Sequence, residues 1–431
     1  MQSLRLCGLI AVVSITLITC AGVMAQTPVR LTLREAEDIA VKNHPQLAAA
    51  ELTARAAEMV HTEVGSARLP AFSASLSGAD ASKDARIGAG GLNNPLILTR
   101  GATGLSISQL LFDFGRTNSL VKSARYRAEA FEQTAEATRA QVLLQVDHAY
   151  FVALRARAVL KVAEQTIAAR QTVSEQVEAL RASGLKSGLD VSVASYNVAE
   201  AKLLLAKSEN DVKAAFADLS AALGSQEDQT FDLAEESLPV IELPDQSEMI
   251  KDALSKRPDL RALQFERDAA YQFLKAEKAL KLPSVAGLWS AGWVPFGDSR
   301  IPNKYSAAGF SVNIPIFNGR LYQAREAEAE FKARAVEQNM KDAENRVTRD
   351  VRIAWLGLNT AYERIGLSAQ LLSKAKEALD LAQERYNLGL SSIVELSQAQ
   401  LNVTIAEIES ANAKYEFQLQ RAILKYQTAS Q

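Results

Sequence analysis

Cysteine and histidine are scarce in this chain, and their scarcity excludes most catalytic and metal chemistry. The 431 residues contain two cysteines, Cys7 and Cys20, and three scattered histidines, His44, His61 and His148. None of these side chains falls into a metal-ligand spacing, and no glycine-rich loop of the phosphate-binding type is present. Charge is nearly balanced, with 48 basic and 50 acidic residues, which argues against nucleic acid as a partner. We therefore expect neither an enzyme nor a cofactor.

The N-terminus reads as an export signal covering residues 1–25. Arg5 is followed by the apolar run Leu6–Thr19, and a small-x-Ala cleavage site ends at Ala25. Cleavage there would leave a cysteine-free chain, which suits an oxidising compartment and excludes disulfides. Two alternatives remain open: a retained membrane anchor, and a lipoprotein signal, in which Cys20 closes a lipobox-like stretch and is acylated.

Two copies of one unit follow each other in the chain. Short stretches recur in the same order at a nearly constant offset, with prolines 213 residues apart in the first two pairs. The matched stretches are 43–47 with 256–260, 67–70 with 280–283, and 181–185 with 386–390. Order kept at a constant offset indicates an internal duplication. We expect a first repeat over residues 26–238 and a second over 239–431.

Each copy is predicted to contain a moderate helix, two strands and a long helical hairpin. Apolar side chains alternate with serine or asparagine in the strand segments, which we place at about 71–79, 102–114, 284–294 and 305–317. Pro315 would confine the end of the last segment to an edge position. The first helices carry capping pairs at Thr32/Glu35 and Asp245/Glu248, and Pro45 and Pro258 interrupt them early and suit the first turn of a restarted helix.

Proline is absent from residues 96–238 and after Pro315, so nothing interrupts the helical pattern there. In the second copy apolar and small residues recur with three-and-four spacing, and a helix from Arg320 to Tyr386 would be about 100 Å long. Glycine-centred breaks at 184–188 and at Gly389 then reverse the direction of the chain in each copy and lead into a second long helix. The fold class is mainly α with a small β part.

Four strands are too few to close a barrel, since about eight are needed. In an exported protein, strands with one apolar and one polar face nevertheless suit a membrane barrel. Three chains would supply twelve strands, and their long helices could continue the barrel as a tube.

The two strand-to-helix joints, Phe112 with Gly115-Arg116 and Phe317 with Gly319-Arg320, complete a pattern that resembles the TolC-like outer-membrane efflux factors over the whole mature chain. This resemblance implies a homotrimer in outer-membrane lipid, with a twelve-stranded barrel and an α-helical tunnel through the periplasm. It implies passive efflux or secretion, driven by an inner-membrane transporter that is joined through a periplasmic adaptor.

The resemblance also assigns roles at the hairpin tips. Glu395 matches an acidic residue that rings the tunnel entrance, whereas a second acidic position of some relatives is Gln398 here. Tyr386 and Asp190 match two members of an entrance latch, and the position of its arginine holds Ser391. Alternatively, Glu395 is an ordinary charged residue on the solvent-exposed face of its helix. Tyr386 would simply belong to the apolar face of the long helix that it ends.

The tips themselves are candidates for docking of the adaptor, because glycine permits close backbone approach. The residues concerned are Gly184, Leu185, Gly389 and Leu390. Alternatively, these residues form an ordinary turn that binds no partner. A different function class, a periplasmic coiled-coil adaptor or structural envelope spacer, would show one hairpin and no paired strands between its helices.

Overall fold

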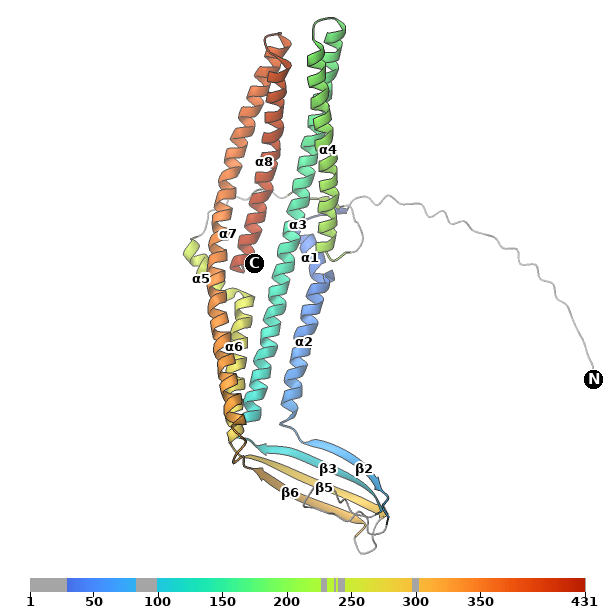
Figure 1. Cartoon of the computed structure of the whole chain (residues 1–431), viewed down its shortest axis with the longest axis vertical. Helices are drawn as coiled ribbons and strands as arrows, with labels where there is room; N and C mark the ends of the chain where they lie inside the picture. Colours follow the sequence, from blue (N-terminus) through green and yellow to red (C-terminus); the bar gives the residue numbers. More distant parts are fainter. Residues whose placement is uncertain are drawn as a thin grey trace, which may run out of the picture.

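The computed structural model describes residues 29–82, 99–225, 231–235, 238, 245–296 and 302–430. The expected signal sequence, Cys20 and the central parts of both strand-connecting loops lie outside this range. The molecule is a long rod of helices that carries a four-stranded sheet at one end and two helical hairpin tips at the other (Figure 1).

Both halves of the chain contain the same series of elements. The first half holds β1 (Val29–Leu31), α1 (Leu33–Asn43), α2 (Pro45–Ser66), β2 (Ala71–Ala79), β3 (Arg100–Phe112), α3 (Arg116–Ala182) and α4 (Gly188–Ala222). The second holds β4 (Phe231–Leu233), α5 (Gln246–Lys256), α6 (Pro258–Lys278), the 3₁₀ turn η1 (Ala279–Lys281), β5 (Ser284–Phe296), β6 (Lys304–Asn313), α7 (Leu321–Asn387) and α8 (Ile393–Thr428). The restart expected at Pro45 and Pro258 divides the first helical segment of each copy into two helices.

The breaks between these paired helices follow from proline. Pro45 and Pro258 each occupy the first turn of a new helix, where a missing N–H costs nothing. Thr32 caps α1 reciprocally with Glu35, while Asp245 caps α5 through the backbone N–H of Glu248 alone. Local side-chain chemistry therefore sets where these helices begin.

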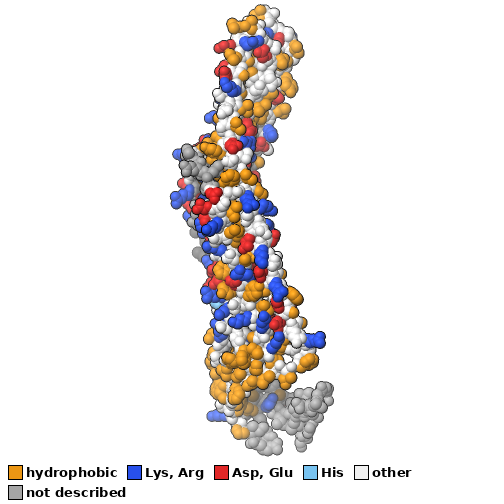
Figure 2. Space-filling model, turned by 90° about the vertical axis from the view of Figure 1, so that its left-hand side faces the viewer, with side chains coloured by type: hydrophobic (Ala, Val, Ile, Leu, Met, Phe, Trp, Pro, Cys, Tyr) orange, Lys and Arg blue, Asp and Glu red, His pale blue; other side chains and the backbone are white. Residues whose placement is uncertain are grey.

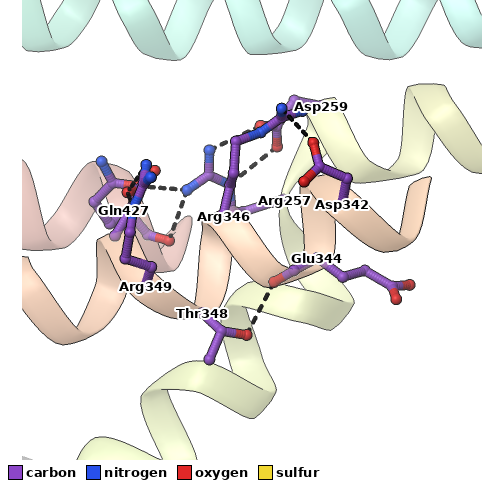
Figure 3. A network of polar contacts seen from close by, with 9 residues as sticks. Arg257, Asp259, Asp342, Glu344, Arg346, Thr348, Arg349 and Gln427 are labelled. Carbon is purple, nitrogen blue, oxygen red and sulfur yellow. Dashed lines mark hydrogen bonds and ion pairs between the residues drawn. The ribbon is translucent and has the colours of Figure 1, made fainter. Parts of the chain in front are cut away.

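Arg257 fastens the break in the second half to the end of α8 (Figure 3). Its guanidinium is buried and donates to both carboxylate oxygens of Asp259, at 3.0 and 2.7 Å, and to the carbonyl oxygen of Gln427 at 3.4 Å. Burial of an arginine is tolerated here because its donors are paired.

The sheet is antiparallel, with strand order β2-β3-β5-β6. Its register aligns residues of one kind across strands: Ser73 faces Ser106, which faces Ser290, and Phe72 faces Ile107, which faces Trp289. The hydroxyls of Ser73 and Ser106 lie 2.6 Å apart. Rows of serine on one face and of apolar side chains on the other give the sheet two faces of opposite character.

Strand bounds differ slightly from those expected from alternation. β3 covers 100–112 instead of 102–114, and β6 ends at Asn313 instead of continuing to residue 317. The early end of β6 agrees with Pro315, which has no N–H to donate to a neighbouring strand.

The two strand-to-helix joints adopt left-handed backbone at equivalent places, but their Gly-Arg motifs are one residue out of phase. Phe114 and Gly115 have φ of 53° and 82° before α3, whereas Gly319 and Arg320 have φ of 63° and 71° before α7. Glycine is therefore the N-cap in the first joint, and arginine is the N-cap in the second.

The long helices α3 and α7 each contain 67 residues, and α4 and α8 contain 35 and 36. Halfway along α3 a buried cluster surrounds Tyr150, whose hydroxyl lies 2.9 and 2.7 Å from the carbonyl oxygens of Leu31 and Ala234. These carbonyls adjoin the parallel pair β1–β4, a contact between the two halves that alternation did not predict.

Candidate functional site

The sheet exposes large apolar side chains that a water-soluble surface would cover. Ile316 and Phe317, just beyond β6, are 93% and 86% exposed. Others on the strands are also exposed, namely Phe72, Leu76, Leu105, Leu288, Phe310 and Val312. Figure 2 shows hydrophobic side chains gathered toward the end of the rod that carries the sheet, with charges spread over the helices. Such a patch marks contact with lipid or with another chain.

The sheet also has open edges. Among the described strands, β2 and β6 each pair on one side only. Every residue of β6 is exposed, and eight of the nine residues of β2 are exposed. Unpaired strand edges of this length are templates for pairing with another chain.

The opposite end of the rod consists of two hairpin tips that turn in the same way. Gly184 and Gly389 have φ of 77° and 73°, and the residue after each glycine donates back to the preceding helix. The backbone N–H of Leu185 lies 2.9 Å from the Leu180 oxygen, and that of Leu390 lies 2.8 Å from the Arg385 oxygen. This is the Schellman turn, which requires left-handed backbone at the glycine. Leu185 and Leu390 are both exposed.

Asp190 lies at the start of α4 and is engaged with the backbone of its own tip. Its carboxylate accepts from the backbone N–H of Ser187 at 2.9 Å and from the Ser187 hydroxyl at 2.7 Å. Hydrogen bonds from the Ser187 side chain and backbone hold the pKa of Asp190 below its usual range. The two residues form a complete capping box.

Glu395 occupies the equivalent place at the start of α8 but makes a different contact. Ser392 caps the helix by accepting from the backbone N–H of Glu395 at 3.3 Å. The Glu395 carboxylate instead lies 3.2 Å from the Arg385 guanidinium, across the turn on the last helical residues of α7. Both side chains of this pair are about half exposed, at 56% for Arg385 and 46% for Glu395.

Tyr386 joins the two hairpins close to their tips. It is 5% exposed and packs in a cluster drawn from all four long helices, which contains Val173, Val177, Ala194, Ile393 and Leu396. The Lys186 ammonium lies 4.1 Å from the centre of its ring. Among the described residues its hydroxyl has no hydrogen-bond partner, and neither has the buried hydroxyl of Ser391. Within one chain, therefore, no hydrogen bond joins Tyr386 to Asp190.

Sequence reasoning did not select Arg385 and Lys186. Lys186 lies on the other hairpin from Tyr386, and no local pattern connects positions so far apart in the chain. Arg385 could have been found, because a basic residue ending one helix and an acidic residue beginning the next are brought together by a tight turn.

The described ranges contain neither a metal-binding cluster nor a membrane-spanning helix. No group of three or more histidine, cysteine, aspartate or glutamate side chains could hold a metal ion there. No helix in those ranges combines the length and apolar character that a bilayer crossing requires.

The chain thus combines a rod of paired helices with glycine-turned tips and a sheet with two open edges and exposed apolar side chains. The model of the family "Outer membrane efflux protein" matches residues 38–225 and 249–426 of the chain. The chain belongs to this family, and it is an outer-membrane efflux protein.

Individual relatives agree with this assignment. The chain is 25% identical to the outer membrane efflux protein BepC of Brucella suis over 326 residues, covering 74% of this chain and 70% of BepC. It is 27% identical to the protein CyaE of Bordetella pertussis, covering 86% and 78% of the two chains. The fold is similar to the crystal structure of the outer membrane protein VceC of Vibrio cholerae, with a TM-score of 0.80 at 20% identity over 92% of this chain and 95% of VceC.

Proposed function

We propose that three copies of this chain form a passive efflux duct, with a twelve-stranded barrel in outer-membrane lipid and a helical tunnel in the periplasm. The open edges of β2 and β6 support this proposal most strongly. Four strands cannot enclose water, since about eight are required. If β6 of one chain pairs with β2 of the next, three chains remove every open edge and direct the apolar face outward.

The repeats at 26–238 and 239–431 would then line the tunnel as six similar hairpins, with the tips at the periplasmic entrance. We propose that Gly184, Leu185, Gly389 and Leu390 meet a periplasmic adaptor that links the duct to an inner-membrane transporter. The exposure of Leu185 and Leu390 supports such a contact. Substrates would pass without any chemistry on the protein.

The test is the assembly and conductance of the mature chain. Purified from membranes in detergent, it is expected to be a trimer by native mass spectrometry and to form ion-conducting pores in planar bilayers. A monomer that stays in solution without detergent would contradict the duct and would favour a periplasmic adaptor or spacer.

We propose further that Glu395 faces the entrance and that Tyr386 and Asp190 help to hold it closed. Because the Tyr386 hydroxyl has no partner within one chain, such a latch would form only when the tips move or chains assemble. Tyr386→Phe and Asp190→Ala are expected to increase the resting conductance of the pore. Unchanged conductance in both variants would exclude the latch, and Gln383→Ala, near the same helix end, is a control.

A further inference from the structure

The two tips use their acidic residues in opposite ways, although the residues are equivalent in the duplication. Asp190 and Glu395 both stand three residues after a capping serine, Ser187 or Ser392. The Asp190 carboxylate closes the capping box on its own tip. The capping box of α8 has only the serine half, so the Glu395 carboxylate is released from the backbone and lies against Arg385.

The partner of Glu395 has no counterpart at the first tip. The position of Arg385 is taken there by Leu180, 205 residues earlier, which carries no charge. Both Leu180 and Arg385 supply the carbonyl that accepts the Schellman bond, so the backbone is the same and the side chain alone differs. The second tip thus carries a pair of opposite charges in contact, while the first carries a carboxylate held by its own helix.

We infer that Arg385 sets the ionic selectivity of the tunnel entrance by neutralising Glu395. This inference rests on the proposed function, in which Glu395 faces the entrance. A carboxylate with a guanidinium 3.2 Å away acts on a passing ion as a dipole, whose field falls off faster than that of a single charge. Beyond about 8 Å, salt at physiological strength screens what remains. The three Glu395 side chains of a trimer then form a ring of ion pairs instead of a ring of free carboxylates.

The assignment can be tested by the K⁺/Cl⁻ permeability ratio, obtained from reversal potentials of pores in planar bilayers under a salt gradient. Arg385→Gln is expected to raise this ratio about threefold or more, since a change of about one kT in the free energy of K⁺ relative to Cl⁻ at the entrance corresponds to that factor. Glu395→Gln is expected to shift the ratio toward anions. Arg385→Gln/Glu395→Gln is expected to return it close to that of the unmodified protein.

Arg181→Gln is the matched control for loss of one positive charge near a tip. Arg181 ends α3, and within the described ranges it makes no ion pair. It is expected to shift the ratio by less than half as much as Arg385→Gln. Arg385→Lys keeps the charge and is expected to leave the ratio unchanged, and circular dichroism and native mass spectrometry would verify that each variant folds and assembles.

The result that overturns the assignment is specific. If the unmodified pore is strongly cation selective, Glu395→Gln abolishes that selectivity and Arg385→Gln has no effect, then Glu395 acts as a free carboxylate. Equal shifts from Arg181→Gln and Arg385→Gln would also overturn it. If neither the unmodified protein nor any variant conducts ions, the proposed duct function is contradicted. That outcome is distinct from pores that conduct with the wrong selectivity, which would contradict only the role of Arg385.

Discussion

The ammonium of Lys186, in the turn of the first hairpin, lies 4.1 Å from the ring centre of Tyr386, at the end of the first helix of the second hairpin. The two residues belong to different repeats, so this cation–π contact joins the two tips of one chain. The ring is almost fully buried, which excludes water from one side of the contact.

Removing the positive charge of Lys186 should loosen the tips. A cation–π contact of this geometry contributes about 1 kcal/mol. Lys186→Gln is therefore expected to increase the resting conductance of the pore and Lys186→Arg to preserve it, as measured by single-channel recording at low voltage. Lys202→Gln, an exposed lysine on α4, should have no effect. Equal resting conductance in all three variants would show that the contact does not hold the tips.

An ion pair between a buried glutamate and a partly exposed arginine holds α6 against α7 on the sheet side of the rod. The Glu277 carboxylate, with a side chain 2% exposed, accepts from Arg325 at 2.7 and 3.1 Å. Arg325→Gln would remove the charge partner of this carboxylate, at a cost of about 2 kcal/mol because Arg325 itself is partly exposed to solvent. The expected readout is earlier thermal loss of helical circular dichroism in detergent.

The control for that measurement lies on the same helix. Lys332→Gln removes an exposed partner of Glu328 one turn away, where an ion pair contributes no more than about 0.5 kcal/mol. Replacing Glu277 and Arg325 together by Met should recover most of the lost stability. A similar decrease for Lys332→Gln and Arg325→Gln would contradict the special role of the buried Glu277 carboxylate.

One substitution should have opposite effects at two glycines of α7 and its turn. Gly366 lies inside α7, and a Cβ there would meet nothing within 4 Å, so Gly366→Ala should stabilise the helix by about 1 kcal/mol. Gly389 has φ of 73° with equally open space, so Gly389→Ala should cost about 1–2 kcal/mol through backbone strain alone. Thermal unfolding of the two variants checks the sign. Destabilisation by Gly366→Ala would instead reveal close approach by another chain.

The capping box at the first tip should make stability depend on acid. Because the pKa of Asp190 is lowered in the fold, its contribution is present above about pH 4, the ordinary aspartate range, and is lost as the pH falls through the lower folded value. Ser187→Ala should cost about 1 kcal/mol at neutral pH, with a smaller deficit in acid. Melting curves of both proteins at several pH values test this. Ser192→Ala removes a hydroxyl that donates to the Gly188 carbonyl and caps no carboxylate, so it should show no such dependence.

Features of local origin were accessible from the sequence. Pro45 and Pro258 begin helices, Gly184 and Gly389 turn the hairpins, and the serine alternation that marks β2 and β3 comes from the sheet's two faces. Each depends on a residue and its immediate neighbours, for which backbone chemistry is decisive.

Contacts between distant segments were not accessible in this way. β1 and β4 contain three residues each and pair across the two repeats, which leaves no periodicity to detect. The phase difference between the Gly-Arg motifs was hidden for another reason. Arg320 adopts a left-handed conformation usual for glycine, so the motif was aligned on its letters and not on the helix start.

The equal length of α3 and α7 restricts how such a protein can change its reach. Each has 67 residues and would extend about 100 Å. A turn deleted from α3 alone would leave its tip about 5 Å below that of α7 and separate Lys186 from Tyr386. A change in the length of the rod must therefore alter both repeats together, in whole helical turns that keep each buried stripe facing inward.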